Sequence, residues 1–287
     1  MKKWISWAVV YLVIVIAGYN IYDLVTRGND NSAEMVETDT EHGHSDQKDA
    51  HGEHDDHGEH DDHGEHGEHG TTTEGESEVD VQLRVTGKGL NIYLTDLSGN
   101  PIEDLEVNHE KLLHLIVVDE HLDNYYHLHP SQIDVGVFQT DIDLPDGAYK
   151  AFIDILPVDH QYQVTPISFE IGEVEDAHEH GHLTVDTELT KVIDGKTATL
   201  ELSSMNAGEP ITLTFTLPDV TIEPYLGAMG HVVILDEEAE NYLHVHPLND
   251  EEPIFETSFD KPGIYKIWAE FQIEGEVYVF PYTIEIE

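Results

Sequence analysis

The chain has 287 residues, no cysteine and a formal net charge of −48, with 12 basic against 60 acidic residues. The absence of cysteine excludes disulfides, zinc–thiolate sites, blue-copper centres, iron–sulfur clusters and a lipidated-cysteine anchor. The shortage of Lys and Arg excludes nucleic acid as a partner, because phosphate binding needs clustered basic residues. The acidity suits cation binding or simply solubility in a salty or alkaline medium, and the length indicates two domains.

Residues 1–27 are predicted to form a transmembrane signal anchor. Trp4–Tyr22 is almost wholly apolar and as a helix would span roughly 28 Å, close to the thickness of a bilayer core. Lys2 and Lys3 precede it, which predicts a cytoplasmic N-terminus and a single-pass protein of the cell membrane with extracytoplasmic C-terminal domains. A cleaved signal peptide is the alternative. The long apolar run and the lack of an A-x-A-like site favour an uncleaved anchor.

Residues 28–78 are predicted to be a disordered, acidic, His-rich linker, because this segment has too few large apolar residues to offset the entropy of ordering. Seven histidines recur at every third position, and in a polyproline II conformation they would project from one side. Such a tract favours weak, rapidly exchanging capture of Zn(II), Ni(II) or Cu(II), although a solvated spacer is the alternative. The seven are His51, His54, His57, His60, His63, His66 and His69.

The remainder is predicted to be all-β, as two tandem immunoglobulin-like or cupredoxin-like sandwiches. Short alternating runs such as GLNIYLTD and TATLELSSM are separated by Pro and Gly turns, with no convincing helical period. The predicted domains are residues 79–173 and 183–287. Between them, residues 174–182 form a polar linker whose histidines could extend the capture function.

One histidine motif occurs twice, in HLIVVDEHLDNYYHLHP and in HVVILDEEAENYLHVHP. Both copies read H-x12-H-x-H-P, with an aspartate five residues after the first histidine (Asp119, Asp236). On a strand, residues i and i+2 share a face, so each H-x-H pair presents two imidazoles side by side. An antiparallel turn back to the preceding strand would bring the third within reach. The two trios are His114, His127 and His129, and His231, His244 and His246.

Three imidazoles on neighbouring strands suit Zn(II) or Cu(II). Each copy offers one further candidate ligand, His109 in the first and Met229 in the second, and a thioether would favour Cu(I). The alternative is a structural role, since a His-Pro turn at a strand end can be retained for its hydrogen bonds. We favour metal binding because all three histidines are present in both copies while many residues between them differ.

The segments HEKLLHLIVVDEHLDNYYHLHP and YLGAMGHVVILDEEAENYLHVHP resemble exported bacterial β-sandwich domains similar in style to the YtkA-like and CopC-like copper-associated proteins. The resemblance covers about residues 80–287 and implies heavy-metal handling.

Catalytic motifs such as G-x-S-x-G or H-E-x-x-H are absent from the sequence, so we do not expect an enzyme. The preferred hypothesis is a membrane-anchored extracytoplasmic protein that binds copper or zinc for buffering, chaperoning or resistance. Two alternatives stay open: a cell-surface interaction module with structural histidines, and an accessory or sensor subunit of a metal transporter or copper enzyme.

Overall fold

The computed structural model describes residues 77–87, 89–174, 182–245, 247–249 and 251–287. All of these fall within one compact unit, Glu65–Glu287. Among them no helix is long and apolar enough to cross a membrane. The predicted anchor and nearly all of the His-rich linker lie outside the described residues, as does most of the linker between the repeats.

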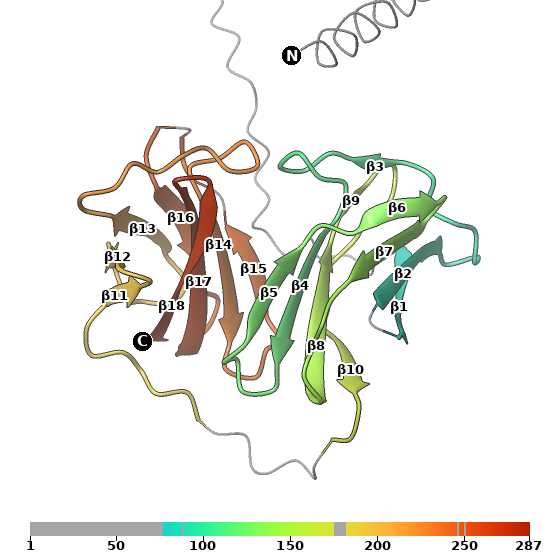
Figure 1. The fold of residues 1–287 in the computed structure, drawn as a ribbon, viewed down its shortest axis with the longest axis horizontal. Helices are drawn as coiled ribbons and strands as arrows, with labels where there is room; N and C mark the ends of the chain where they lie inside the picture. The colour runs from blue at the N-terminus through green and yellow to red at the C-terminus, as the bar shows by residue number, and fades with distance from the viewer. Residues whose placement is uncertain (1–76, 88, 175–181, 246, 250) are drawn as a thin grey trace, which may run out of the picture. The chain divides into compact units, whose positions relative to one another are not determined.

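The first repeat is a sandwich of two antiparallel four-stranded sheets (Figure 1). One sheet has the strand order β1-β2-β7-β6 and the other β10-β8-β4-β5, while β3 pairs with β9 in a short two-stranded sheet. The strands are β1 (Val79–Thr86), β2 (Gly89–Asp96), β3 (Leu105–Glu106), β4 (His114–Asp119), β5 (Tyr125–Leu128), β6 (Ser131–Asp134), β7 (Val137–Asp141), β8 (Gly147–Asp154), β9 (Leu156–Pro157) and β10 (Ile167–Ile171).

The second repeat also forms two antiparallel four-stranded sheets, with orders β11-β12-β13-β16 and β15-β14-β17-β18. The β15-β14-β17-β18 sheet has the same connectivity as β5-β4-β8-β10 of the first repeat. The predicted all-β architecture and internal repeat are therefore confirmed. The strands are β11 (Thr190–Ile193), β12 (Lys196–Leu202), β13 (Pro210–Thr216), β14 (His231–Asp236), β15 (Tyr242–Val245), β16 (Ile254–Ser258), β17 (Gly263–Ile273) and β18 (Glu276–Ile286).

A tyrosine near the start of β8 and its counterpart in β17 tie each sandwich together at one corner. The Tyr149 hydroxyl donates to the Pro145 carbonyl at 2.9 Å, and the Tyr265 hydroxyl donates to the Lys261 carbonyl at 2.8 Å. In each copy the tyrosine lies four residues after its acceptor. These hydrogen bonds give a structural role to the matching GAYK and GIYK segments.

Strand β4 is buried on both faces because it lies between two apolar layers. Leu115 and Val117 enter the core of the first sandwich, whereas Ile116 and Val118 point the other way, toward the second repeat. Strand β14 behaves in the same way, with Val232 and Ile234 in its own core. A continuous run of β-branched and aliphatic residues is the expected pattern for a strand covered on both sides.

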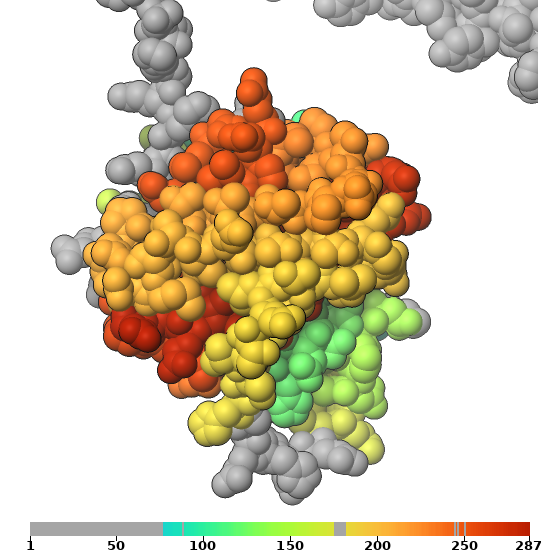
Figure 2. Space-filling view, turned by 90° about the vertical axis from the view of Figure 1, so that its left-hand side faces the viewer, coloured from blue at the N-terminus to red at the C-terminus, as the bar shows by residue number. Residues whose placement is uncertain are grey.

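The outward faces of β4 and β14 pack against each other through a third apolar cluster, which we call the interdomain cluster. Tyr125 stacks on Trp268 with ring centroids 4.8 Å apart, and Phe152 stacks on Tyr242 at 5.3 Å. On the opposite side of the second repeat, the yellow and orange segments form the outer surface (Figure 2). The fully buried members of the cluster are Ile116, Val118, Leu122, Phe152, Val233, Leu235, Ala239 and Trp268.

Candidate metal centre

The β4–β5 hairpin brings together the three histidines of the first motif. The strands pair antiparallel, with His127 opposite Ile116 and Leu128 opposite Leu115. One further step along this register puts His129 beside His114, the first residue of β4. The two-residue alternation then directs His127 and His129 to the same face, as the sequence predicted.

The shared aspartate of the motif holds this hairpin in register. Oδ1 of Asp119 accepts hydrogen bonds from the backbone N–H groups of Asp123 at 2.8 Å and Asn124 at 3.1 Å. Asp236 does the same in the second repeat, accepting from the N–H groups of Glu240 and Asn241. The aspartate is therefore a turn residue, which explains its fixed distance from the first histidine.

The three rings have the separations expected of ligands to one ion. Ring centroids lie 5.2 Å apart for His114 and His127, 5.0 Å for His114 and His129, and 4.8 Å for His127 and His129. One ligand nitrogen from each ring lies within 4.8 Å of the other two. Tetrahedral zinc with metal–nitrogen distances of about 2.0–2.1 Å would hold imidazole centroids about 5 Å apart. We call these three residues the His cluster.

A backbone carbonyl sets the tautomer of His114. Its Nε2 lies 2.9 Å from the carbonyl oxygen of Asn108, and a carbonyl can only accept, so Nε2 carries the hydrogen. In the neutral ring Nδ1 then carries the lone pair. Nδ1 lies 2.9 Å from Nε2 of His127, so His114 presents its basic nitrogen to the centre of the cluster.

His127 is held from its other side by a residue of the second repeat. Its Nδ1 lies 2.9 Å from Oε2 of Glu270 in β17, and the two side chains are 2% and 3% exposed. Burial acts to raise the pKa of Glu270, but the nearby His127 outweighs this and the net pKa is lowered. Glu270 is therefore a buried carboxylate that orients the His127 ring from across the interdomain contact.

Two rings of the cluster, His114 and His129, are kept neutral, which is the form that binds metal. Burial, opposed in part by the hydrogen bond to the Asn108 carbonyl, lowers the pKa of His114 from 6.5 to about 4. Burial and then the neighbouring His127 and His114 lower the pKa of His129 to about 3. The buried Nε2 of His129 has no hydrogen-bond partner among the described residues, so this nitrogen is available to an ion.

His231, the first histidine of the second motif, lies beside the cluster of the first. It is fully buried, and its Nε2 donates to the carbonyl of Tyr225 at 3.0 Å, in the manner of His114 and Asn108. Its ring centroid is 6.1 Å from that of His127 and 5.4 Å from that of His109. Burial lowers its pKa to about 4. His231 therefore lies in the same region as the first trio, and the predicted second trio stays a prediction.

The other predicted metal ligands lie farther from the His cluster, have no recorded contact with it, or fall outside the described residues. His109 lies with its ring centroid 6.3 Å from that of His114, farther than the cluster members lie from one another. Met229 is half-buried before β14, and none of the contacts recorded for the described residues joins it to the cluster. The backbone of His244 pairs with Val233. The side chain of His244, all of His246 and the seven linker histidines lie outside the described residues, so their predicted roles stay predictions.

Sequence reasoning missed Glu270 and the approach of His231 to the first motif. A signal for Glu270 was present, because it is the acid two residues after Trp268, within the mostly apolar stretch IWAEF of β17. Asp154 stands in the matching place after Phe152, and it pairs with His114 across β4 and β8 as Glu270 pairs with His231 across β14 and β17. Acids therefore stand at matching strand positions in the two copies, buried at Glu270 and half-buried at Asp154, and a buried acid calls for a partner.

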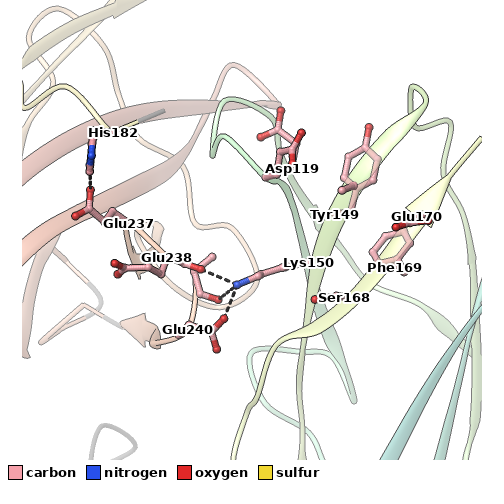
Figure 3. A pocket seen from close by; sticks show the side chains of 13 residues that line it. Asp119, Tyr149, Lys150, Ser168, Phe169, Glu170, His182, Glu237, Glu238 and Glu240 are labelled. Atoms are coloured by element: carbon pink, nitrogen blue, oxygen red, sulfur yellow. Dashed lines mark hydrogen bonds and ion pairs between the residues drawn. The ribbon is translucent and has the colours of Figure 1, made fainter. Parts of the chain in front are cut away.

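A separate cavity of 820 Å³ lies between the repeats and is strongly acidic (Figure 3). Lys150 points into it and donates to Oε1 of Glu240 and to the carbonyl of Glu238, both at 2.6 Å. His182 contacts Glu237 at 3.7 Å. The members of the His cluster do not line this cavity. The contacts of Lys150 are therefore interdomain contacts that do not involve the cluster.

The family described as "Domain of unknown function (DUF8832)" matches residues 70–175 and again residues 190–287. The chain belongs to this family and contains its domain twice. No curated protein matches the chain.

Solved structures similar to the chain include three from chicken. They are the FN1–FN3 domains of CNTN1 (10% identity, TM-score 0.22, 73% of this chain and 67% of that one), a two-domain fibronectin type-III segment of tenascin (11%, 0.24, 73% and 99%) and the interferon gamma receptor alpha chain (12%, 0.22, 74% and 98%). These identities and TM-scores are low, so the proposals below rest on the residues of this chain.

Proposed function

We propose that this protein binds a divalent transition metal, Zn(II) or Cu(II), at the His cluster. The observation that carries the proposal is the convergence of three buried imidazoles from one hairpin, with one ligand nitrogen of each within 4.8 Å of the others. Backbone and carboxylate partners orient two of the rings, as is usual for metal-binding histidines. A cluster retained only for its hydrogen bonds would not be expected to leave the buried Nε2 of His129 without a partner among the described residues.

The donor set favours a divalent ion over Cu(I). All three donors are imidazole nitrogens, whereas Cu(I) prefers thioether or thiolate sulfur. An ion would replace the proton on Nε2 of His127 and leave the Nδ1 proton on the Glu270 side. Three protein ligands leave a fourth position for another donor. That position would allow exchange of the ion with a partner, as buffering, chaperoning or resistance requires.

We further propose that the sandwiches are immunoglobulin-like rather than cupredoxin-like. Strands β1, β2 and β7 correspond to one immunoglobulin sheet, and β10, β8, β4 and β5 to the other. The hydrogen bonds of Tyr149 and Tyr265 match the tyrosine corner of such domains.

Metal titration of the full-length protein tests the proposed site. The seven linker histidines should first be replaced by Ser, so that weak sites do not mask the cluster. Competition between the protein and a chelator for Zn(II) should then show one tight site. His127→Ala with His129→Ala should remove that site, at a cost in stability because Glu270 then loses its buried partner. His129→Ala alone should weaken the site with little loss of folding. His121→Ala, an exposed histidine of the same hairpin, is the matched control and should bind as the parent does. A parent protein without a tight site would instead support structural histidines in an interaction module.

The membrane location is a proposal that rests on residues 1–27 of the sequence. Protease added to cells with a permeable wall should digest the chain beyond the anchor. A mature protein whose N-terminus begins after residue 20 would instead identify a cleaved signal peptide.

A further inference from the structure

A buried polar contact between the two repeats ends on a residue of the His cluster. The His127–Glu270 pair joins positions 143 residues apart at 2.9 Å, with both side chains almost completely buried. Removing two charged or polar groups from water is costly unless each is well paired. A buried contact of this kind beside the apolar interdomain cluster therefore calls for a functional explanation.

The two nitrogens of His127 face different repeats. Nε2 faces His114 within the first repeat, and Nδ1 faces Glu270 of the second. A carboxylate on the far nitrogen of a metal-binding imidazole fixes the ring orientation and raises its basicity. The second repeat thus provides the group that prepares a ligand of the first.

Packing of the repeats sets the place of Glu270. Tyr125 precedes His127 by two residues on β5 and shares its face, and it stacks on Trp268, which precedes Glu270 by two residues on β17. The aromatic stack and the His127–Glu270 contact are therefore neighbouring contacts between the same two strands, β5 and β17. A change in docking of the repeats would move Glu270 relative to His127.

We propose that docking of the second sandwich tunes metal affinity at the His cluster through Glu270, and that metal binding in turn strengthens the docking. Glu270 is a positioning residue, since it acts through His127. The proposal rests on the metal-binding function proposed above. Reciprocity follows from linkage: if docking tightens metal binding by a given factor, metal tightens docking by the same factor.

The affinity test uses the full-length protein with the seven linker histidines replaced by Ser. Glu270→Gln removes the charge and keeps an acceptor, and Zn(II) affinity measured by chelator competition should fall about 10- to 100-fold. Glu240→Gln is the matched control, because Glu240 also forms an ion pair between the repeats, with Lys150 at 2.6 Å, but away from the cluster. Its Zn(II) affinity should equal that of the parent.

Hydrogen exchange gives the reciprocal readout. Zn(II) should slow amide exchange in β14 and β17 of the second repeat, although the proposed ligands all lie in the first. This protection should be lost or much reduced in Glu270→Gln. If the role of Glu270 is purely structural, Glu270→Gln should lower the thermal midpoint of the metal-free protein. The Zn(II) affinity and the Zn(II)-induced protection of β14 and β17 should then stay as in the parent.

The outcomes distinguish this inference from the proposed function. No tight Zn(II) site in the parent protein would overturn both. Tight binding that depends on His127 and His129 but is unchanged in Glu270→Gln would overturn only the inference, as would protection confined to the first repeat. Should Glu270→Gln fail to fold, Glu270→Asp retains the charge on a shorter side chain. Its affinity should then lie below that of the parent, and parental affinity would count against the inference.

Discussion

His114 and His231 show how a single residue can be prepared for a role by its backbone surroundings. Each donates its Nε2 hydrogen to the carbonyl six residues earlier, from Asn108 or Tyr225. Each is fully buried and begins an apolar strand. The carbonyl selects one tautomer and burial keeps the ring neutral, so in both repeats Nδ1 carries the lone pair.

The metal-free protein should lose stability as the pH falls from about 6.5 toward 4. The pKa of His114 and that of His231 are each lowered from 6.5 to about 4, chiefly by burial. In this window the unfolded chain binds protons that the folded protein does not, so the contribution is complete above pH 6.5 and is lost on acidification. Each ring contributes up to about 3 kcal/mol at roughly 1.4 kcal/mol per pKa unit. Denaturant unfolding at pH 7.5 and pH 5 measures the effect.

His114→Gln provides the control for this pH dependence. Gln cannot take up a proton in the window, so the difference in unfolding free energy between pH 7.5 and pH 5 should shrink. An unchanged difference would show that the pH dependence comes from other groups.

At the scale of the element, the β4–β5 hairpin is the unit that builds the cluster. Its turn is held by Asp119, which accepts two backbone hydrogen bonds, and the second repeat uses Asp236 in the same way. The two hairpins are thus alike in construction. The described histidine trio lies on the first hairpin. The same substitution made in each hairpin can therefore distinguish an effect on stability from an effect on metal binding.

Asp119→Ala should lower both the free energy of unfolding and the affinity for Zn(II). Loss of the acceptor leaves turn N–H groups without their partner and costs about 1–2 kcal/mol, and a looser register moves His127 away from His114. Asp236→Ala should cost a similar amount of stability but change Zn(II) affinity less than threefold. Chemical denaturation and chelator competition measure the two effects. Equal loss of affinity in both variants would show that the hairpin turn is not what positions the ligands.

At the scale of the whole molecule, the interdomain cluster should make the two repeats unfold together. The outward faces of β4 and β14 are fully buried, and Trp268, 2% exposed, packs at their contact. Trp268→Ala should cost about 3–5 kcal/mol by the loss of buried aromatic contacts. Calorimetry should show one transition for the parent and a lower midpoint for the variant. Two well-separated transitions in the parent would mean that the repeats are independent.

The His-rich tract extends metal capture beyond the folded repeats. A synthetic peptide of residues 41–70 should bind Zn(II) or Cu(II) at pH 7.5 and release it near pH 5, because protonated imidazole does not bind metal. Calorimetry on this peptide measures the binding. A matched peptide with Ser at the seven histidines should not bind, and an absence of binding by the native peptide would leave the tract as a spacer.

The sequence by itself determined the parts of this protein that depend on neighbours along the chain. The duplication, the short alternating strands and the same-face placement of His127 and His129 all follow from local pattern. The approach of His127 and His129 to His114 also follows from the sequence, because a short turn sets the register of the β4–β5 hairpin. The all-β architecture and the convergence of one histidine trio could therefore be predicted.

Only the tertiary structure decided which groups meet across the two repeats. Neither the contact of Glu270 with His127 nor the approach of His231 follows from spacing, since apolar packing summed over β4, β8, β14 and β17 selects the docked faces. The same burial sets the low pKa values of His114 and His231, because desolvation depends on everything that surrounds a ring rather than on its neighbours in sequence.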